Sequence, residues 1–257
     1  MTPKSRTFLK LLLLLLLPLG IMAVVGYRES RRQKLDSALF SALKQKDLGM
    51  VKARLAEGAD PNARDVQFDK RHLWERLWDR VRGTPLAIDE EPTALWVALG
   101  SSHTGETNAS SQEMITALLD AGATIDAKGI NGSTVLFHAI ENEDVAAVKL
   151  LLARGAHVAI KNDDGKTPLH WTAYNLNTEI ALLLLLKGAD VNAPDLGGDT
   201  PLCSAVLYNQ EALVKLLMAR GAKVNVRDNA GYTPLLFAQQ NHQPGILKVL
   251  KAAGATE

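Results

Sequence analysis

Gly165, Lys166 and Thr167 are the residues of this sequence whose order most resembles a ligand-binding motif. The tripeptide matches the end of the P-loop, in which backbone N–H groups and a lysine hold phosphates. A P-loop also needs a preceding strand and a glycine five positions before Gly165, but Ile160 stands there and no strand is predicted. We therefore expect no nucleotide site at this tripeptide.

Serine, histidine and cysteine side chains are the other candidates for chemistry. Ser101, Ser102 and His103 are consecutive, so their side chains do not converge on one reacting atom as in a catalytic triad. The six histidines lack the H-x-x-x-H spacing of a helical metal site, and the single cysteine, Cys203, excludes cysteine clusters and intramolecular disulfides. The sequence predicts no enzyme activity, no metal and no cofactor.

The composition favours a helical protein with an aliphatic core. Hydrophobic residues make up 47% of the 257 residues and aromatic residues only 5%, so aliphatic side chains must fill the interior. The formal net charge of +1 predicts no general attraction to nucleic acid. Because no catalytic group was found either, we expect neither a nucleic-acid partner nor a small-molecule substrate.

The elements that position these residues recur with a period of 33 residues. Two marks share this period: the dipeptide Gly-Ala at Gly122, Gly155, Gly188, Gly221 and Gly254, and threonine at Thr134, Thr167, Thr200 and Thr233. The last three threonines are followed by Pro-Leu. Several marks in one fixed register are typical of a stacked repeat protein.

Each mark has a physical role in a helical hairpin. Threonine caps a helix, and proline suits its first turn, where no backbone N–H is needed. Leu169 and Ala173 are four residues apart and share one helical face, and a glycine ends the second helix in a left-handed conformation. One hairpin cannot bury its apolar face alone, so neighbouring hairpins must stack.

Two segments carry a resemblance to a known family. Thr167 to Ala173 resembles the T-P-L-H-x-A mark of ankyrin repeats, and Gly188 to Ala193 resembles the turn that ends such a repeat. The resemblance implies an all-α ankyrin-repeat solenoid of helix-turn-helix units with short hairpin tips that binds a protein partner. The register predicts a domain over 35–257, with repeats at about 35–65, 92–128, 129–161, 162–194, 195–227 and 228–257. The second repeat is expected to begin at Thr93, with Thr84 as the alternative.

The segment 66–91 is an insertion between the first two repeats. A helix over residues 70–82 would place five apolar residues on one face: Leu73, Trp74, Leu77, Trp78 and Val81. One hypothesis is that this face packs on the solenoid. The other is that Trp74 and Trp78 dock a partner or a membrane surface, since a basic amphipathic helix with tryptophan suits an interface.

The N-terminal residues 1–34 predict an apolar helix with a basic flank. Residues 8–26 would form a helix of roughly 28 Å, close to the thickness of a hydrocarbon core of about 30 Å. A basic cluster follows at 28–34. This pattern favours an uncleaved signal anchor that crosses the membrane once; a cleaved signal peptide is the alternative, although no A-x-A triplet follows.

The charges beside this segment leave the orientation open. Three basic residues, the last of them Lys10, precede the uncharged stretch 11–26, and four follow it. A short basic N-terminus favours placing the repeats on the exported (periplasmic) side, whereas the cluster at 28–34 opposes that. The sequence therefore predicts a membrane-tethered binding module, and the alternative is an exported, cleaved effector or immunity-type protein.

The resemblance also implies which residues bind the partner. Ankyrin domains typically use a concave face made of hairpin tips and the exposed ends of the first helices. The register carries these positions onto Asn131, Glu141, Asn142, Asp163, Asp164, Lys166, Tyr174, Asn175, Asp199, Leu207, Tyr208, Tyr232, Gln240 and Asn241. Tyrosine suits binding anchors because it adds a large apolar body and a polar tip.

Overall fold

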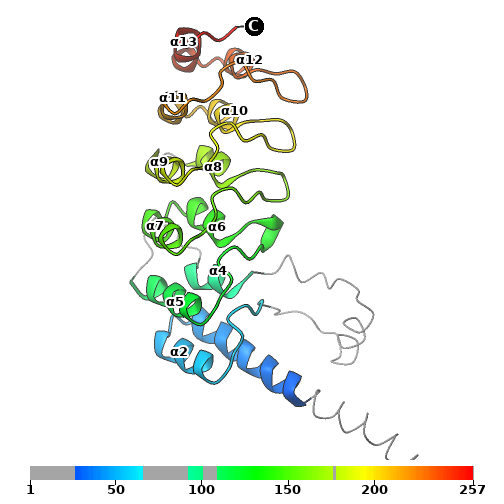
Figure 1. Cartoon of the computed structure of the whole chain (residues 1–257), viewed down its shortest axis with the longest axis vertical. Helices are drawn as coiled ribbons and strands as arrows, with labels where there is room; N and C mark the ends of the chain where they lie inside the picture. The colour runs from blue at the N-terminus through cyan, green and yellow to red at the C-terminus, as the bar shows by residue number, and fades with distance from the viewer. Residues whose placement is uncertain (1–26, 66–91, 101–108, 176–177, 257) are drawn as a thin grey trace, which may run out of the picture.

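The computed structural model describes residues 27–65, 92–100, 109–175 and 178–256. In these ranges the chain forms pairs of antiparallel helices that stack into an elongated solenoid (Figure 1). The first helix of each pair lies between the second helix and a projecting hairpin tip. Apart from an isolated bridge between Arg64 and Thr93, these ranges contain no β-structure. The predicted all-α solenoid is confirmed.

The helices form two columns along the stack. The first helices are residues 27–44, α4 (Ala94–Leu99), α6 (Val135–Glu141), α8 (Pro168–Trp171) with the 3₁₀ turn η2 (Thr172–Tyr174), α10 (Pro201–Leu207) and α12 (Pro234–Gln240). The second helices are α2 (Leu48–Ala56), α5 (Ala109–Asp120), α7 (Val145–Ala153), α9 (Thr178–Leu186), α11 (Glu211–Ala219) and α13 (Pro244–Ala252). A further 3₁₀ turn, η1 (Ile130–Gly132), forms one hairpin tip.

Capping residues fix where the short helices begin and where they end. Thr93 Oγ1 accepts the N–H of Trp96 at 3.2 Å, so α4 begins at the threonine of the register. Asp144 Oδ1 caps α7 by accepting the N–H of Ala147 at 2.8 Å. After α9, Gly188 has φ +87°, a left-handed conformation that a Cβ disfavours.

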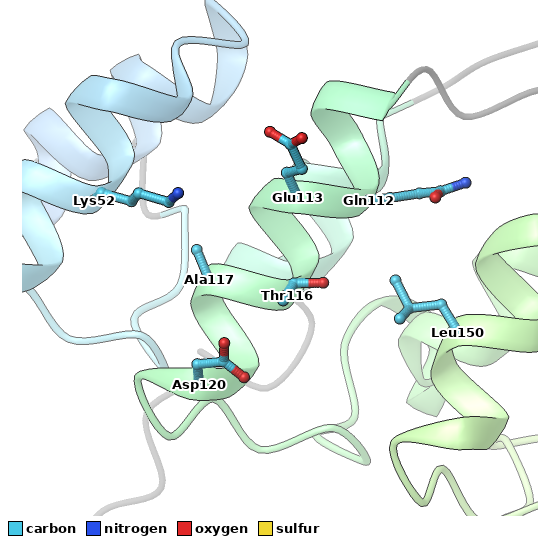
Figure 2. Close-up of a pocket in the computed structure, with 7 residues that line it drawn as sticks. All are labelled: Lys52, Gln112, Glu113, Thr116, Ala117, Asp120 and Leu150. Atoms are coloured by element: carbon cyan, nitrogen blue, oxygen red, sulfur yellow. The ribbon is translucent and has the colours of Figure 1, made fainter.

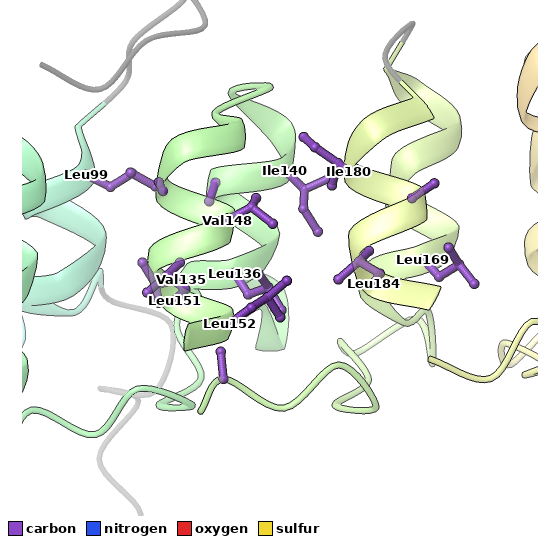
Figure 3. Packing of buried hydrophobic residues seen from close by; sticks show 14 of the residues in the cluster. Leu99, Val135, Leu136, Ile140, Val148, Leu151, Leu152, Leu169, Ile180 and Leu184 are labelled. Atoms are coloured by element: carbon purple, nitrogen blue, oxygen red, sulfur yellow. The ribbon is translucent and has the colours of Figure 1, made fainter. Parts of the chain in front are cut away.

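A single apolar core runs through the stack. Figure 3 shows Leu136, Val148 and Leu151 between α6 and α7, and Ile180 and Leu184 on the neighbouring α9. The buried cluster extends from Leu39 in the first helix to Leu250 in α13. Because each hairpin buries its face against the next, the first helices are held at fixed spacing, with one edge of each facing solvent.

Side-chain amides also tie each repeat to the next one. Asn192 Nδ2 donates to the Gly221 carbonyl at 3.2 Å, and its Oδ1 accepts the Lys223 N–H at 2.8 Å. Asn62 and Asn225, which hold the same place after their own Gly-Ala turns, make the same pair of bonds to the following repeat. These bonds set the rotation between neighbouring turns.

Several predicted segments fall outside the described residues. They are the apolar segment 8–26, the insertion 66–91 and its Trp74 and Trp78. The helix of residues 27–44 begins within the described part at the basic flank and continues into the first repeat without a break at residue 34. Among the described helices, none has the length and apolar character needed to cross a membrane.

Candidate protein-binding face

The hairpin tips and the exposed edges of the first helices together form one surface, which we call the inner face. Consecutive tips are joined by single backbone bonds. Asp163 N–H donates to the Asn131 carbonyl at 3.1 Å, and Leu196 N–H donates to that of Asp164 at 3.0 Å. These links hold the tips of adjacent repeats side by side, so the inner face is a continuous, ordered surface.

Aspartate side chains stiffen individual tips. Asp195 Oδ1 accepts the N–H groups of Gly197 and Asp199 at 2.8 and 2.9 Å. Asp228 Oδ1 does the same for Ala230 and Tyr232 at 2.9 and 2.7 Å. Such Asx turns satisfy the backbone of the tip locally. Side chains carried on these tips are therefore held in place before any partner arrives.

Aromatic side chains line the middle of the inner face. The rings of Trp171 and Tyr174 have centroids 4.9 Å apart, and those of Tyr174 and Tyr208 are 4.3 Å apart. Phe137, from the preceding repeat, meets Trp171 edge-on at 5.8 Å. The four rings form a row from α6 through α8 with η2 to the end of α10, in which Phe137 is buried, Trp171 is half-buried and the two tyrosines are exposed. We call the pair of Tyr174 and Tyr208 the tyrosine pair.

The tyrosine pair stays accessible to solvent. Tyr174 is 42% exposed and Tyr208 41%, and the adjacent Leu207 is 48% exposed. Lys166 Nζ lies 3.4 Å from the Tyr174 hydroxyl. Partial burial and the neighbouring Tyr174 hydroxyl raise the pKa of Tyr208, so its phenol is neutral at physiological pH and can donate a hydrogen bond.

A second aromatic pair lies near the C-terminal end of the inner face. Tyr232, on the tip of the last repeat, stacks on Phe237 of α12 with centroids 5.3 Å apart and planes 26° from parallel. Tyr232 is exposed and Phe237 is half-buried. The predicted binding tyrosines are therefore not one cluster, because Tyr232 pairs with its own repeat.

The inner face carries acidic side chains with almost no basic ones. In the tips and first helices of the last four repeats, the carboxylates outside the core are Glu141, Glu143, Asp163, Asp164, Asp195, Asp199 and Asp228. Lys166 is the one lysine or arginine in the matching tips and first helices, 129–145, 162–175, 195–210 and 228–243. Burial first, and then Asp195 and Asp228, raise the pKa of Asp199.

Two residues predicted to bind a partner instead brace the solenoid. Asn175 is buried, and its Nδ2 donates to the Ile140 carbonyl in the preceding repeat. Asn142 Nδ2 donates to the Gly100 carbonyl at 2.9 Å. The expectation for Asn175 is corrected: its amide satisfies a carbonyl at a helix end and does not face solvent. Asn142 is half-buried and its donor is already used.

The remaining predicted residues do lie at the surface. Asn131, Glu141, Gln240 and Asn241 are exposed, at one tip and at the ends of α6 and α12. Glu141 Oε2 lies 3.6 Å from Nδ1 of His138, a ring that stacks on Trp96 with centroids 4.2 Å apart. Burial lowers the pKa of His138, which opposes its protonation beside Glu141.

Trp171 also belongs to the inner face, although the sequence did not predict it there. It is half-buried and supports Tyr174 from the side, so the tyrosine ring rests on a fixed apolar surface. The spacing i, i+3 between two aromatic residues on one helix was the available signal. Exposed Leu196, at the tip before Asp199, adds a further apolar side chain.

His170 and Cys203, considered above for chemistry, are both part of the core. Thr167 N–H donates to His170 Nδ1 at 3.0 Å, so the ring proton is on Nε2, which donates to the Asp199 carbonyl at 3.0 Å. Burial lowers the pKa of His170 and raises that of Cys203. A neutral, enclosed thiol and an imidazole whose nitrogens are both used leave no nucleophile or base here.

A groove lies on the opposite side of the solenoid. Figure 2 shows it between α2, α5 and α7, with a volume of about 340 Å³. Its lining is Lys52, Gln112, Glu113, Thr116, Ala117, Asp120 and Leu150. Asp120 already pairs with Arg154 at 3.0 Å. This groove is open to solvent and lacks the aromatic side chains of the inner face.

Comparison with known proteins confirms the resemblance to ankyrin repeats. A family model described as ankyrin repeats (3 copies) matches residues 105–195, and one described as ankyrin repeats (many copies) matches residues 183–238. Together they cover just over half of the chain, and neither describes a catalytic family. A search of curated proteins found no match. With its stacked helical pairs and capped 33-residue units, the chain belongs to the ankyrin-repeat family.

Proposed function

We propose that this protein is a membrane-tethered module that binds a protein partner through its inner face. Ankyrin repeats suggest protein–protein interaction in general. The observation that carries the specific proposal is the exposed tyrosine pair beside Leu207. Exposed aromatic side chains that lie close together and are held by their neighbours are typical anchors of protein interfaces.

The support beneath the tyrosine pair favours binding over simple packing. Trp171 contacts Tyr174 from one side, and Tyr208 contacts it from the other. Little conformational entropy is then lost when a partner covers the rings, since they are already ordered. Lys166 and the two hydroxyls add polar groups at the rim, where they can orient a partner without being buried unpaired.

The tether is proposed from the N-terminal sequence and from the helix that follows it. The apolar segment 8–26 has the length of a membrane span. In the described helix of residues 27–44, Arg28, Arg31 and Lys34 are exposed, and Tyr27 is 72% exposed. Basic and aromatic residues beside an apolar segment are typical of the membrane–water boundary.

Affinity capture from native membranes after crosslinking tests the binding proposal. We expect wild-type protein to retain a partner that the double variant Tyr174→Ala/Tyr208→Ala loses by at least about tenfold, because interface tyrosines typically contribute 1–2 kcal/mol or more each. Quantitative mass spectrometry of the captured proteins gives the measurement. Circular dichroism confirms that the variant keeps its helices.

A matched control separates loss of the inner face from general loss of apolar surface. Leu186 in α9 is 68% exposed but belongs to a second helix, away from the tips. Leu186→Ala should leave the captured partner unchanged. If Leu186→Ala and the tyrosine variant lose the same amount of captured partner, or if both capture as much as the wild type, the inner face is not the binding surface.

A further inference from the structure

We propose that the segment recognised by the inner face is cationic: an extended peptide of the partner whose arginine or lysine side chains lie between the tyrosine pair and the acidic tips. This inference rests on the proposed function and names the chemistry of the partner. Three observations carry it. They are the charge asymmetry of the solenoid, the position of the carboxylates relative to the tyrosine pair, and the internal use of the only lysine.

The charge of the inner face differs from that of the whole chain. The chain has a formal net charge of +1, yet the tips and first helices of the last four repeats hold seven carboxylates outside the core against one lysine. Lys161 and Arg227, which directly precede two of these tips, are already used within the solenoid, where they donate to the carbonyls of Pro194 and Gly231 at 2.6 and 2.9 Å. The second helices and their turns carry most of the basic side chains of the same repeats: Lys149, Arg154, Lys187, Lys215, Arg220, Lys223, Lys248 and Lys251. A face of one sign attracts and orients a partner of the opposite sign.

The carboxylates lie close to the aromatic row. Lys166, whose Nζ is 3.4 Å from the Tyr174 hydroxyl, is near enough to Asp199 and to Tyr208 to affect the pKa of both. Asp163 and Asp164 are exposed on the same tip as Lys166. A guanidinium group that rests on the face of Tyr208 would therefore have carboxylates within its reach, and arginine favours that combination of ring and acid.

Lys166 does not neutralise this surface. One ammonium group cannot balance Asp163, Asp164, Asp195 and Asp199, and Lys166 is half-buried against Tyr174. Burial and the neighbouring Asp195 and Asp228 raise the pKa of Asp199, which shows that these carboxylates repel one another. A bound cation would relieve that repulsion, whereas an acidic partner would increase it.

Selection from a library of displayed random 16-residue peptides tests this inference. The full-length protein, held in detergent micelles, is the target, and the triple variant Asp163→Asn/Asp164→Asn/Asp199→Asn is the comparison. We expect the selected peptides to be enriched in arginine and lysine. The triple variant should bind them about tenfold more weakly, since three exposed charge pairs together account for a change of that size.

A charge-matched control uses second-helix glutamates. The triple variant Glu113→Gln/Glu179→Gln/Glu211→Gln removes three carboxylates from α5, α9 and α11, away from the tips. It should bind the selected peptides as the wild type does. Affinity should also fall with added salt for the wild type, and fall less steeply for the inner-face triple variant.

The outcomes distinguish this inference from the function on which it rests. Selected peptides that are neutral or acidic, and that still need the tyrosine pair, would overturn the cationic partner and leave the binding face in place. Peptides that bind the Tyr174→Ala/Tyr208→Ala variant as well as the wild type would contradict both. Equal weakening by the two triple variants would show that only net charge matters, which also rejects the inference.

Discussion

At the scale of single residues, the structure separates side chains that hold the solenoid together from side chains that remain available to a partner. Asn175 and Tyr174 are adjacent in sequence, yet the first is buried against Ile140 and the second is exposed beside Tyr208. The cause is local: η2 ends in an extended residue at Asn175, with φ −108° and ψ 149°. That turn directs the amide inward and the tyrosine outward.

His170 provides a prediction at this scale. Its pKa is lowered by burial, so the folded protein holds it neutral while the unfolded chain binds a proton near its usual pKa. The contribution of His170 to the free energy of unfolding is therefore fully present above about pH 6.5. It falls as the pH is lowered, because the unfolded state takes up more protons than the folded state. We expect His170→Gln to lose less stability than the wild type between pH 7.5 and 5.5.

Urea denaturation at several pH values measures this difference. His170→Gln should also lower the free energy of unfolding at pH 7.5 by about 1–3 kcal/mol, since the bonds to Thr167 and Asp199 are weakened. Exposed His242, changed to glutamine, is the control and should follow the wild type. Parallel pH profiles for His170→Gln and the wild type would show that His170 does not couple protonation to folding.

At the scale of elements, the same pair of bonds braces three of the five interfaces between repeats. Asn62, Asn192 and Asn225 each bond the glycine carbonyl and a backbone N–H of the next turn. Asp126 accepts the N–H of His157 and pairs with the His157 imidazole, but its carboxylate cannot donate to the glycine carbonyl of the next turn. Ala159 occupies the same place in the first of the four regular repeats, 129–161, and can make neither bond. The contact between the turns of Gly155 and Gly188 therefore lacks this brace.

We expect Ala159→Asn to stabilise the protein by about 1 kcal/mol, because it would supply the missing bonds to the Gly188 turn. Ala159 is exposed and lies in the same kind of turn as Asn192, so the new side chain displaces nothing. Ala159→Asp, which can accept a bond but not donate one, should give a smaller gain. Thermal unfolding followed by circular dichroism would measure both, and a destabilised Ala159→Asn would contradict the brace.

At the scale of the whole molecule, the solenoid presents two faces of different character. The inner face is aromatic and acidic, and the outer side of the second helices is mostly basic. A stack of repeats allows this division because each repeat contributes one tip and one helix edge to the same side. The residues of the proposed binding face come from several repeats in this way, without any one repeat forming a pocket.

The proposed tether gives a prediction for the whole chain. Full-length protein should stay in the membrane pellet after extraction with alkaline carbonate, and a chain that begins at Tyr27 should be released, because the apolar segment 8–26 is then missing. The mass of the membrane-bound protein reports whether the segment is retained. Extraction of the full-length chain would reject the tether, and a mass lower by the leader would favour the exported, cleaved form.

Much of the fold was predictable because its signals are local. Thr93, Thr167, Thr200 and Thr233 stand at helix N-termini in the structure, as the repeat marks predicted, since a cap depends only on the residues that follow it. The binding face was less accessible to sequence reasoning. The register aligns Asn175 with Tyr208, although one is buried and the other is exposed.

The sequence by itself determined the 33-residue period, the start of each regular helix and the aliphatic core, because these depend on spacing within one repeat. Only the tertiary structure decided which of the predicted binding residues are exposed. Tyr174 meets Tyr208, and Asn175 meets Ile140, across the contact between two repeats. Such contacts depend on how far one repeat is rotated against the next. That rotation follows from the packing and the braces of the whole stack, which no single repeat contains.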